Sequence, residues 1–216
     1  KDAVLVGHSM GGIIARLLVS DADLTPAAMK LLPNRRAQQF KNDPLFKSRL
    51  DIQPIPNFSR AIFLAAPHRG TEFADRWFTL AARKVIRLPG AFLGALTDVI
   101  QSSDPDLQAF IKDVDNGLIQ NGPSDLSKNS NFTRLTKNVV PYKGMKFHSI
   151  MGNATKSDDL NIITDDVVPY TSAHLDGALS EKIIKGGHSI QETPEAVLEL
   201  RRILRLQLTE LGLYKP

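Results

Sequence analysis

The sequence has no cysteine and few aromatic side chains, with one Trp and three Tyr among 216 residues. The lack of cysteine excludes disulfides, thiolate nucleophiles and cysteine-based metal sites. No apolar run approaches the roughly 20 residues of a membrane span. The net charge of +4, from 27 basic and 23 acidic residues, is too small to indicate a nucleic-acid partner. A hydrophobic content of 42% over this length predicts one sizeable domain with its own core.

Short apolar or β-branched segments, each closely followed by Gly or Pro, have the pattern of parallel strands covered on both faces. They are residues 3–6, 61–65, 147–151 and 182–185. Helical patterns alternate with these segments. One spans residues 13–19, and another spans residues 195–208 after an expected N-cap at Thr193 and a first-turn Pro194. This alternation predicts an α/β fold with a mostly parallel sheet.

Two segments, residues 20–57 and 71–146, are too long to be simple crossovers between strands. We expect them to be helical cap or lid insertions within a single domain of residues 1–216, with helices at 73–86, 91–100 and 107–114 and a polar region at 116–131. The first segment is rich in basic residues, which are Lys30, Arg35, Arg36, Lys41, Lys47 and Arg49. Such a cluster favours a solvated helical surface, and its alternative is a patch that meets anionic lipid or an acidic substrate.

The most informative short motif is Gly7-His8-Ser9-Met10-Gly11, which fits G-x-S-x-G and lies between a predicted strand and a predicted helix. A serine at so tight a strand-to-helix turn is held with its hydroxyl clear of the sheet, and small neighbours let the two elements approach closely. The helix N-terminus directs backbone N–H groups toward a carbonyl oxygen under attack. Ser9 is therefore a candidate nucleophile, and the alternative is a plain glycine-rich turn.

A serine nucleophile needs a base, and that base needs an orienting acid. His188 follows the last predicted strand on a Gly-Gly loop, and the preceding loop supplies Asp165 and Asp166, which gives the chain order Ser, Asp, His. We prefer Asp165 as the acid and keep Asp166 as the alternative, because adjacent side chains point in different directions. The remaining candidates are weaker: Asp158 and Asp159 as acids, and His174, at the start of an expected helix, as base.

Four segments together resemble one family. They are GHSMGG (7–12), FLAAPHRGTEFAD (63–75), DDVVPYTSAHLDGA (165–178) and GGHS (186–189). They are similar to segments of α/β-hydrolase esterases and lipases, including bacterial true lipases and inositol-deacylase-like members. The resemblance implies Ser9 as nucleophile, His188 as base, Asp165 as orienting acid and the backbone N–H of Met10 as one oxyanion donor. Asp166 stands where that family usually has glycine.

Other polar residues of these motifs have two interpretations. His8, His68 and Arg69 are candidates for the rim of the pocket, and for His68 and Arg69 we favour hydrogen bonding across the top of the sheet. Some lipases of this type carry additional acidic residues near the histidine loop that bind calcium. That pattern has no match here, so no metal and no cofactor are expected.

The resemblance implies a serine hydrolase that cleaves small-molecule or lipid carboxylic esters through an acyl-enzyme. The alternatives are an acyltransferase or lipid deacylase in peripheral contact with a membrane, and a non-catalytic interaction domain. In this family the nucleophile follows the fifth of eight strands. We therefore expect the N-terminal half of the same protein, with a second oxyanion donor, to precede Lys1. The location, cell envelope or cytoplasm of a bacterium, stays open.

Overall fold

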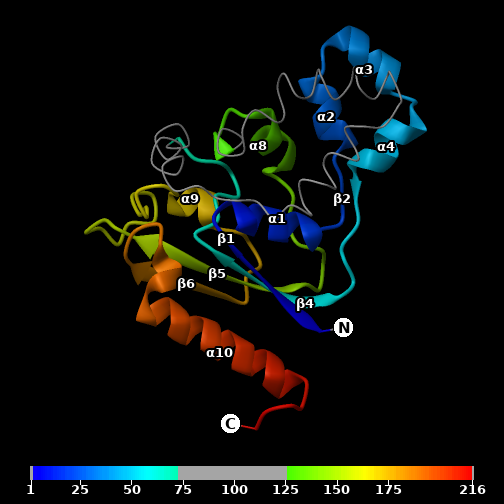
Figure 1. The fold of residues 1–216 in the computed structure, drawn as a ribbon. Coiled ribbons are helices and arrows are strands. Elements are labelled where there is room, and N and C mark those ends of the chain that lie inside the picture. Colours follow the sequence, from blue (N-terminus) through cyan, green and yellow to red (C-terminus); the bar gives the residue numbers. More distant parts are fainter. Residues whose placement is uncertain (1, 73–125, 216) are drawn as a thin grey trace, which may run out of the picture.

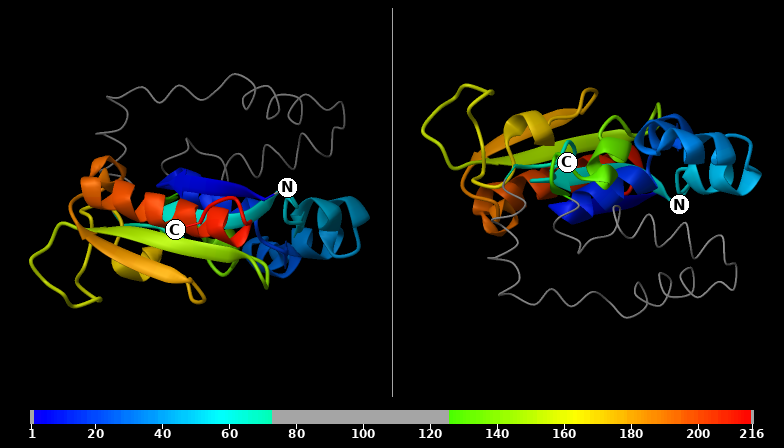
Figure 2. Two further views of the ribbon diagram at one scale, coloured as in Figure 1. Left: turned by 90° about the horizontal axis from the view of Figure 1, so that it is seen from below. Right: turned by 90° about the horizontal axis from the view of Figure 1, so that it is seen from above.

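The computed structural model describes residues 2–72 and 126–215. Four strands form one parallel sheet in the order β1 (Ala3–His8), β4 (Phe58–Leu64), β5 (Lys146–Asn153) and β6 (Ser180–Lys185). Helix α1 (Met10–Leu18) covers one face of this sheet, and α10 (Pro194–Glu210) covers the other (Figures 1 and 2). The described chain is therefore a three-layer α/β arrangement, as predicted. The helices expected at 73–86, 91–100 and 107–114 lie outside the described residues.

Alternate residues of β4 separate the core into two parts, because successive side chains of a strand point to opposite faces. Ala61 and Phe63 pack with α1 in a cluster that also holds Val19 and Phe147. The intervening Ile62 packs with α10 in a second cluster. The other buried members of that second cluster are Leu64, Ala65, Ile150, Ile184, Ile190, Ala196 and Ile203. Both faces of the central strand are thus buried, as its apolar sequence indicates.

The edge strands β1 and β6 depart from the prediction. We expected all four strands to be buried on both faces, but in the described sheet β1 pairs with β4 alone and β6 pairs with β5 alone, and both are partly exposed along their length. Val6 retains 48% of its exposure. The apolar sequence of residues 3–6 correctly predicts a strand, but burial also depends on neighbours that local sequence does not specify.

Helix α10 is fixed to the sheet by its cap and by polar contacts. Its N-cap is Thr193, whose Oγ1 accepts a hydrogen bond from Ala196 N at 3.3 Å, and it begins at the expected proline. At its other end, the buried Arg60 of β4 donates to Gln207 Oε1 at 2.8 Å and to Glu210 Oε2 at 2.7 Å. These contacts orient the C-terminal helix across β4.

The segment 20–57 contains α2 (Thr25–Leu31), α3 (Asn34–Phe40) and α4 (Pro44–Leu50), between the short paired strands β2 (Ala22–Asp23) and β3 (Asp51–Ile52). The three helices lie beyond the C-terminal end of α1, away from the turn at its N-terminal end (Figure 1). Their described basic side chains are exposed: Lys30, Arg35, Lys41, Lys47 and Arg49. A role of this segment as a cap remains a prediction.

Short helices complete the described chain: α8 (Asn131–Thr136), α9 (Tyr170–Ala173) and the 3-10 helix η2 (Ile190–Glu192). Helix α9 begins at Tyr170, and His174 follows its last residue. The expectation that His174 lies at a helix start is therefore wrong, because Pro169 provides the N-terminal boundary. Within the described ranges, no helix is long and apolar enough to cross a membrane.

Candidate active site

The turn between β1 and α1 holds Ser9 in a backbone conformation that L-residues rarely adopt, with φ 54° and ψ −126°. Its N–H donates to Leu64 O at 2.9 Å, which fixes the turn to β4. Two glycines make the turn possible. A Cβ at Gly7 would lie 2.5 Å from Gly11 O, and a Cβ at Gly12 would lie 2.4 Å from Ala66 Cβ. The motif therefore has the strand-to-helix geometry that its spacing predicts.

Ser9, His188 and Asp165 form a continuous hydrogen-bonded chain. His188 Nε2 lies 2.9 Å from Ser9 Oγ, and His188 Nδ1 lies 2.9 Å from Asp165 Oδ2. A carboxylate only accepts, so Nδ1 carries the hydrogen and Nε2 accepts from the serine hydroxyl. The three side chains come from the carboxyl-terminal sides of β1, β6 and β5 respectively, where ligands of parallel sheets usually bind.

The carboxylate of Asp165 is buried, with 1% exposure, and both of its oxygens have partners. Oδ1 accepts from Val167 N at 2.9 Å and from Val168 N at 2.6 Å, which directs Oδ2 toward the imidazole. Gly152 of β5 leaves the room for this side chain, since a Cβ there would lie 2.7 Å from Asp165 Cβ. The alternative Asp166 is exposed and has φ 72°, so of the two neighbours only Asp165 meets His188.

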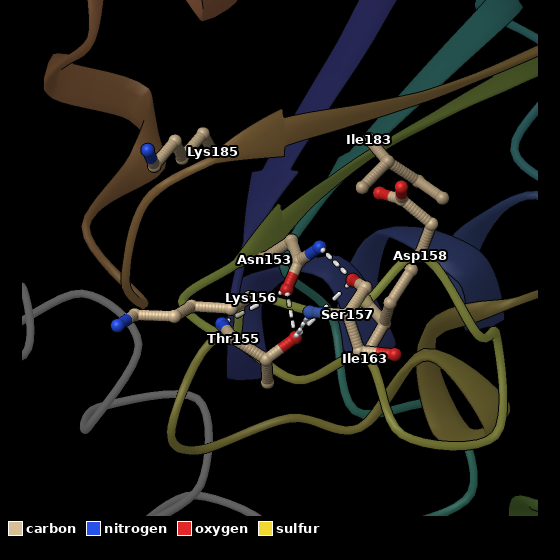
Figure 3. Close-up of a pocket in the computed structure, with 8 residues that line it drawn as sticks. All are labelled: Asn153, Thr155, Lys156, Ser157, Asp158, Ile163, Ile183 and Lys185. Atoms are coloured by element: carbon tan, nitrogen blue, oxygen red, sulfur yellow. Dashed lines mark hydrogen bonds between the residues drawn. The ribbon is translucent and has the colours of Figure 1, made fainter.

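The weaker acid candidates lie elsewhere. Asp158 lines an open pocket of about 570 Å³ at the carboxyl ends of β5 and β6, shown in Figure 3. The turn that forms one side of this pocket is held by Asn153 Nδ2, which donates to Ser157 O at 2.9 Å. Asp159 instead accepts from Asn161 N at 2.9 Å within its own turn. Neither carboxylate contacts His188 in the structure.

His8, the residue before Ser9, turns toward the histidine loop. Its Nε2 lies 2.9 Å from the carbonyl oxygen of His188, and the two rings are 5.1 Å apart between centroids. Burial lowers the pKa of His8, and the hydrogen bond to the His188 backbone partly opposes this shift. The sequence placed His8 near the pocket but gave no sign of this contact, because the two residues are 180 positions apart.

The PHRG segment after β4 gives different results for its two polar residues. Arg69 N donates to Ser172 Oγ at 3.1 Å, and the Arg69 guanidinium donates to the carbonyl oxygens of Thr171 and His174. Hydrogen bonding across the top of the sheet therefore describes Arg69. It does not describe His68, which is 1% exposed and whose ring nitrogens have no hydrogen-bond partner in the described part of the chain. The rings of His68 and Phe63 pack edge to face, with their centroids 5.0 Å apart.

His174 belongs to a separate polar cluster. Its Nδ1 lies 2.7 Å from Glu181 Oε2 and its Nε2 lies 3.1 Å from Asp176 Oδ1. The hydrogen bond to Glu181 raises the pKa of His174. Across residues 2–72 and 126–215, no group of three or more His, Asp or Glu side chains has an arrangement that could hold a metal ion.

Comparisons with known proteins add the family. Among solved structures, the mature lipase BlEst2 of Bacillus licheniformis aligns at 16% identity and a TM-score of 0.44, covering 94% of this chain and 65% of that one. A lipase-esterase related protein from Clostridium acetobutylicum aligns at 15% identity and a TM-score of 0.33, covering 94% of this chain and 65% of that one. This chain thus spans slightly less than two thirds of each.

The search of curated proteins returned no match. The family model described as "Alpha/beta hydrolase family" matches residues 1–200. This match includes the Ser9 turn and both of the loops that carry Asp165 and His188. The chain therefore belongs to the alpha/beta hydrolase family.

Proposed function

We propose that this chain carries the catalytic triad of a serine hydrolase that cleaves carboxylic esters. The observation that carries the proposal is the hydrogen-bonded chain from Ser9 Oγ through the His188 imidazole to the buried Asp165 carboxylate, with 2.9 Å at each step. A hydroxyl is a weak nucleophile until an adjacent base accepts its proton, and this arrangement supplies both the base and the group that orients it.

In the proposed reaction, His188 Nε2 takes the Ser9 proton as Oγ attacks the ester carbonyl carbon. The imidazolium that forms keeps its Nδ1–H on Asp165 Oδ2, whose negative charge stabilises it. The tetrahedral intermediate collapses when the imidazolium gives its proton to the leaving alkoxide, which leaves an acyl group on Ser9. Water then attacks this acyl-enzyme with His188 as base, and the acid product and free serine result.

The negative oxygen of the tetrahedral intermediate needs hydrogen-bond donors. Met10 is the first residue of α1. Because the first N–H groups of a helix have no partner within the helix, its amide is available beside Ser9, at the positive end of the helix dipole. We assign Met10 N–H as one oxyanion donor. Removing a single donor of this kind typically costs about 10² to 10³ in rate.

The test uses the full-length protein with a p-nitrophenyl ester of a short acid. Ser9→Ala should lower turnover by about 10³-fold or more, because it removes the nucleophile. Ser48→Ala is the matched control, since Ser48 is exposed on α4 and its hydroxyl donates to Leu45 O in the same helix at 3.0 Å. Equal turnover by Ser9→Ala and the parent protein would refute the proposal.

One observation favours a second candidate function on membrane components: the basic side chains of α2, α3 and α4 are exposed. A positive surface of this kind attracts anionic lipid headgroups, so an acyltransferase or lipid deacylase acting on membrane components is the alternative. Product analysis in the presence of an alcohol acceptor separates acyl transfer from hydrolysis. Formation of a new ester supports transfer, and release of the free acid alone supports hydrolysis.

A further inference from the structure

His8 connects the strand that carries the proposed nucleophile to the loop that carries the proposed base. It is the last residue of β1, and its Nε2 lies 2.9 Å from the backbone carbonyl oxygen of His188. A carbonyl can only accept a hydrogen bond, so His8 is held as the tautomer with its hydrogen on Nε2. His8, which precedes Ser9, therefore donates to the main chain of His188, and the side chain of His188 is the hydrogen-bond partner of Ser9.

The loop that carries His188 is built from residues with wide conformational freedom. Gly186 and Gly187 precede the histidine, and Gly186 has φ 155°, a value that L side chains rarely adopt. Gly187 and Ser189 are exposed on either side of His188. The His188 ring is already held at both nitrogens by Asp165 and Ser9. The contact from His8 adds a restraint on the backbone itself, next to the flexible glycines.

The charge state of His8 suits this position. Burial is the largest cause and lowers the pKa of His8, and the charge of His188 also lowers it. The hydrogen bond to the His188 backbone and the nearby carboxylates of Asp165 and Glu192 oppose the shift. The net lowering of its pKa favours the neutral form of His8 beside His188. A second positive ring at a centroid distance of 5.1 Å would oppose that charge.

We propose that His8 is a positioning residue for the reaction. Its Nε2–H fixes the His188 backbone so that His188 Nε2 stays within hydrogen-bond distance of Ser9 Oγ. This inference rests on the proposed serine-hydrolase function and assigns His8 no contact with substrate. Loss of the donor should lower kcat and leave KM nearly unchanged, because small misplacements of a catalytic group act on the chemical step.

The experiment compares His8→Phe with His8→Gln in the full-length protein. Phenylalanine keeps a ring of similar size but has no donor, whereas the amide nitrogen of glutamine reaches about as far as Nε2. We expect kcat for a p-nitrophenyl ester to fall by about 10- to 100-fold in His8→Phe, with KM within about twofold. His8→Gln should recover kcat to within about threefold of the parent.

A further variant keeps the test independent of whether the phenylalanine variant folds. His8→Asn carries the same amide as glutamine on a shorter side chain that cannot reach the carbonyl, so its kcat should fall with that of His8→Phe. Unchanged kcat in His8→Phe and His8→Asn, or an equal loss in His8→Gln and His8→Asn, overturns the positioning role. Labelling of the parent at Ser9 by a fluorophosphonate is measured in parallel. A labelled parent with unaffected variants refutes the role of His8 alone, and an unlabelled parent refutes the proposed function.

Discussion

Acidification should destabilise the fold at His148, a buried residue near the amino-terminal ends of β5 and β6. Its Nε2 lies 2.5 Å from Arg60 Nη1, and its Nδ1 lies 2.7 Å from Ser180 Oγ. A guanidinium only donates, so Nε2 must be unprotonated and Nδ1 must carry the single hydrogen. Burial, followed by the charges of Arg60 and Arg202, lowers the pKa of His148 to about 4.

The lowered pKa of His148 determines both the direction and the size of the change in the free energy of unfolding with pH. In the unfolded chain the pKa of histidine is about 6.5, so the unfolded state takes up a proton first as the pH falls. The contribution of His148 to the free energy of unfolding is fully present above about pH 6.5 and is lost as the pH drops toward the folded pKa of about 4. Between about pH 7.5 and about pH 5, the linkage relation gives a loss of about 2 kcal/mol, which screening by solvent reduces to about 1–2 kcal/mol.

Urea unfolding at the two pH values, followed by circular dichroism, measures this loss. His148→Gln is the control, since its amide oxygen can accept from Arg60 and the side chain does not titrate. The free energy of unfolding of the parent should fall by about 1–2 kcal/mol more than that of the variant. Equal losses in the two proteins would show that His148 is not the group responsible.

Other substitutions test the site and the packing that supports it. Asp165→Asn should lower kcat by about 10²- to 10⁴-fold because it removes the charge facing His188, whereas Asp166→Asn, on an exposed side chain, should stay within about threefold of the parent. Gly12→Ala should destabilise the fold by about 1–3 kcal/mol in urea unfolding, since its Cβ would overlap Ala66. Gly11→Ala has open space in the same helix and should stabilise it by about 0.5–1 kcal/mol, so equal effects would contradict the packing argument. Thr193→Ala removes the cap of α10 and should lower the melting temperature, at a cost of about 1 kcal/mol.

Local sequence predicts best those parts of the fold where a short residue pattern is compatible with only one local structure. Apolar runs that end near glycine or proline gave the four strands, and the Thr193-Pro194 pair gave the start of α10. The strand-to-helix turn at Ser9 also follows from its motif, because the turn has no room for a side chain at positions 7 and 12, where the motif has glycine. In each case the determining contacts are close in sequence or require a specific residue type.

The parts that sequence could not predict depend on contacts between distant residues. The preference for Asp165 over Asp166 could be stated from the sequence, but the contact of Asp165 with His188 forms only where β5 and β6 pair. The exposure of Val6 depends on what lies beside β1, and the burial of His68 depends on how the loop after β4 packs against the core. None of these is expressed in a local pattern.

The contact of His8 with the His188 carbonyl is of the same kind. Nothing near either residue indicates the contact, and it becomes visible only when the carboxyl ends of β1 and β6 are brought to one side of the sheet. The position of His8 beside the candidate nucleophile indicates a place near the pocket, but the sequence does not distinguish a pocket-lining ring from one that fixes a neighbouring loop.

The most direct test of the central claim is the site of covalent labelling. The full-length protein is treated with a fluorophosphonate, digested and analysed by mass spectrometry. We predict a single phosphonate adduct on Ser9 and its loss in His188→Ala, because the hydroxyl reacts only when the neighbouring imidazole takes its proton. No adduct at Ser9, or an adduct there that forms equally fast in His188→Ala, would contradict a catalytic triad of Ser9, His188 and Asp165.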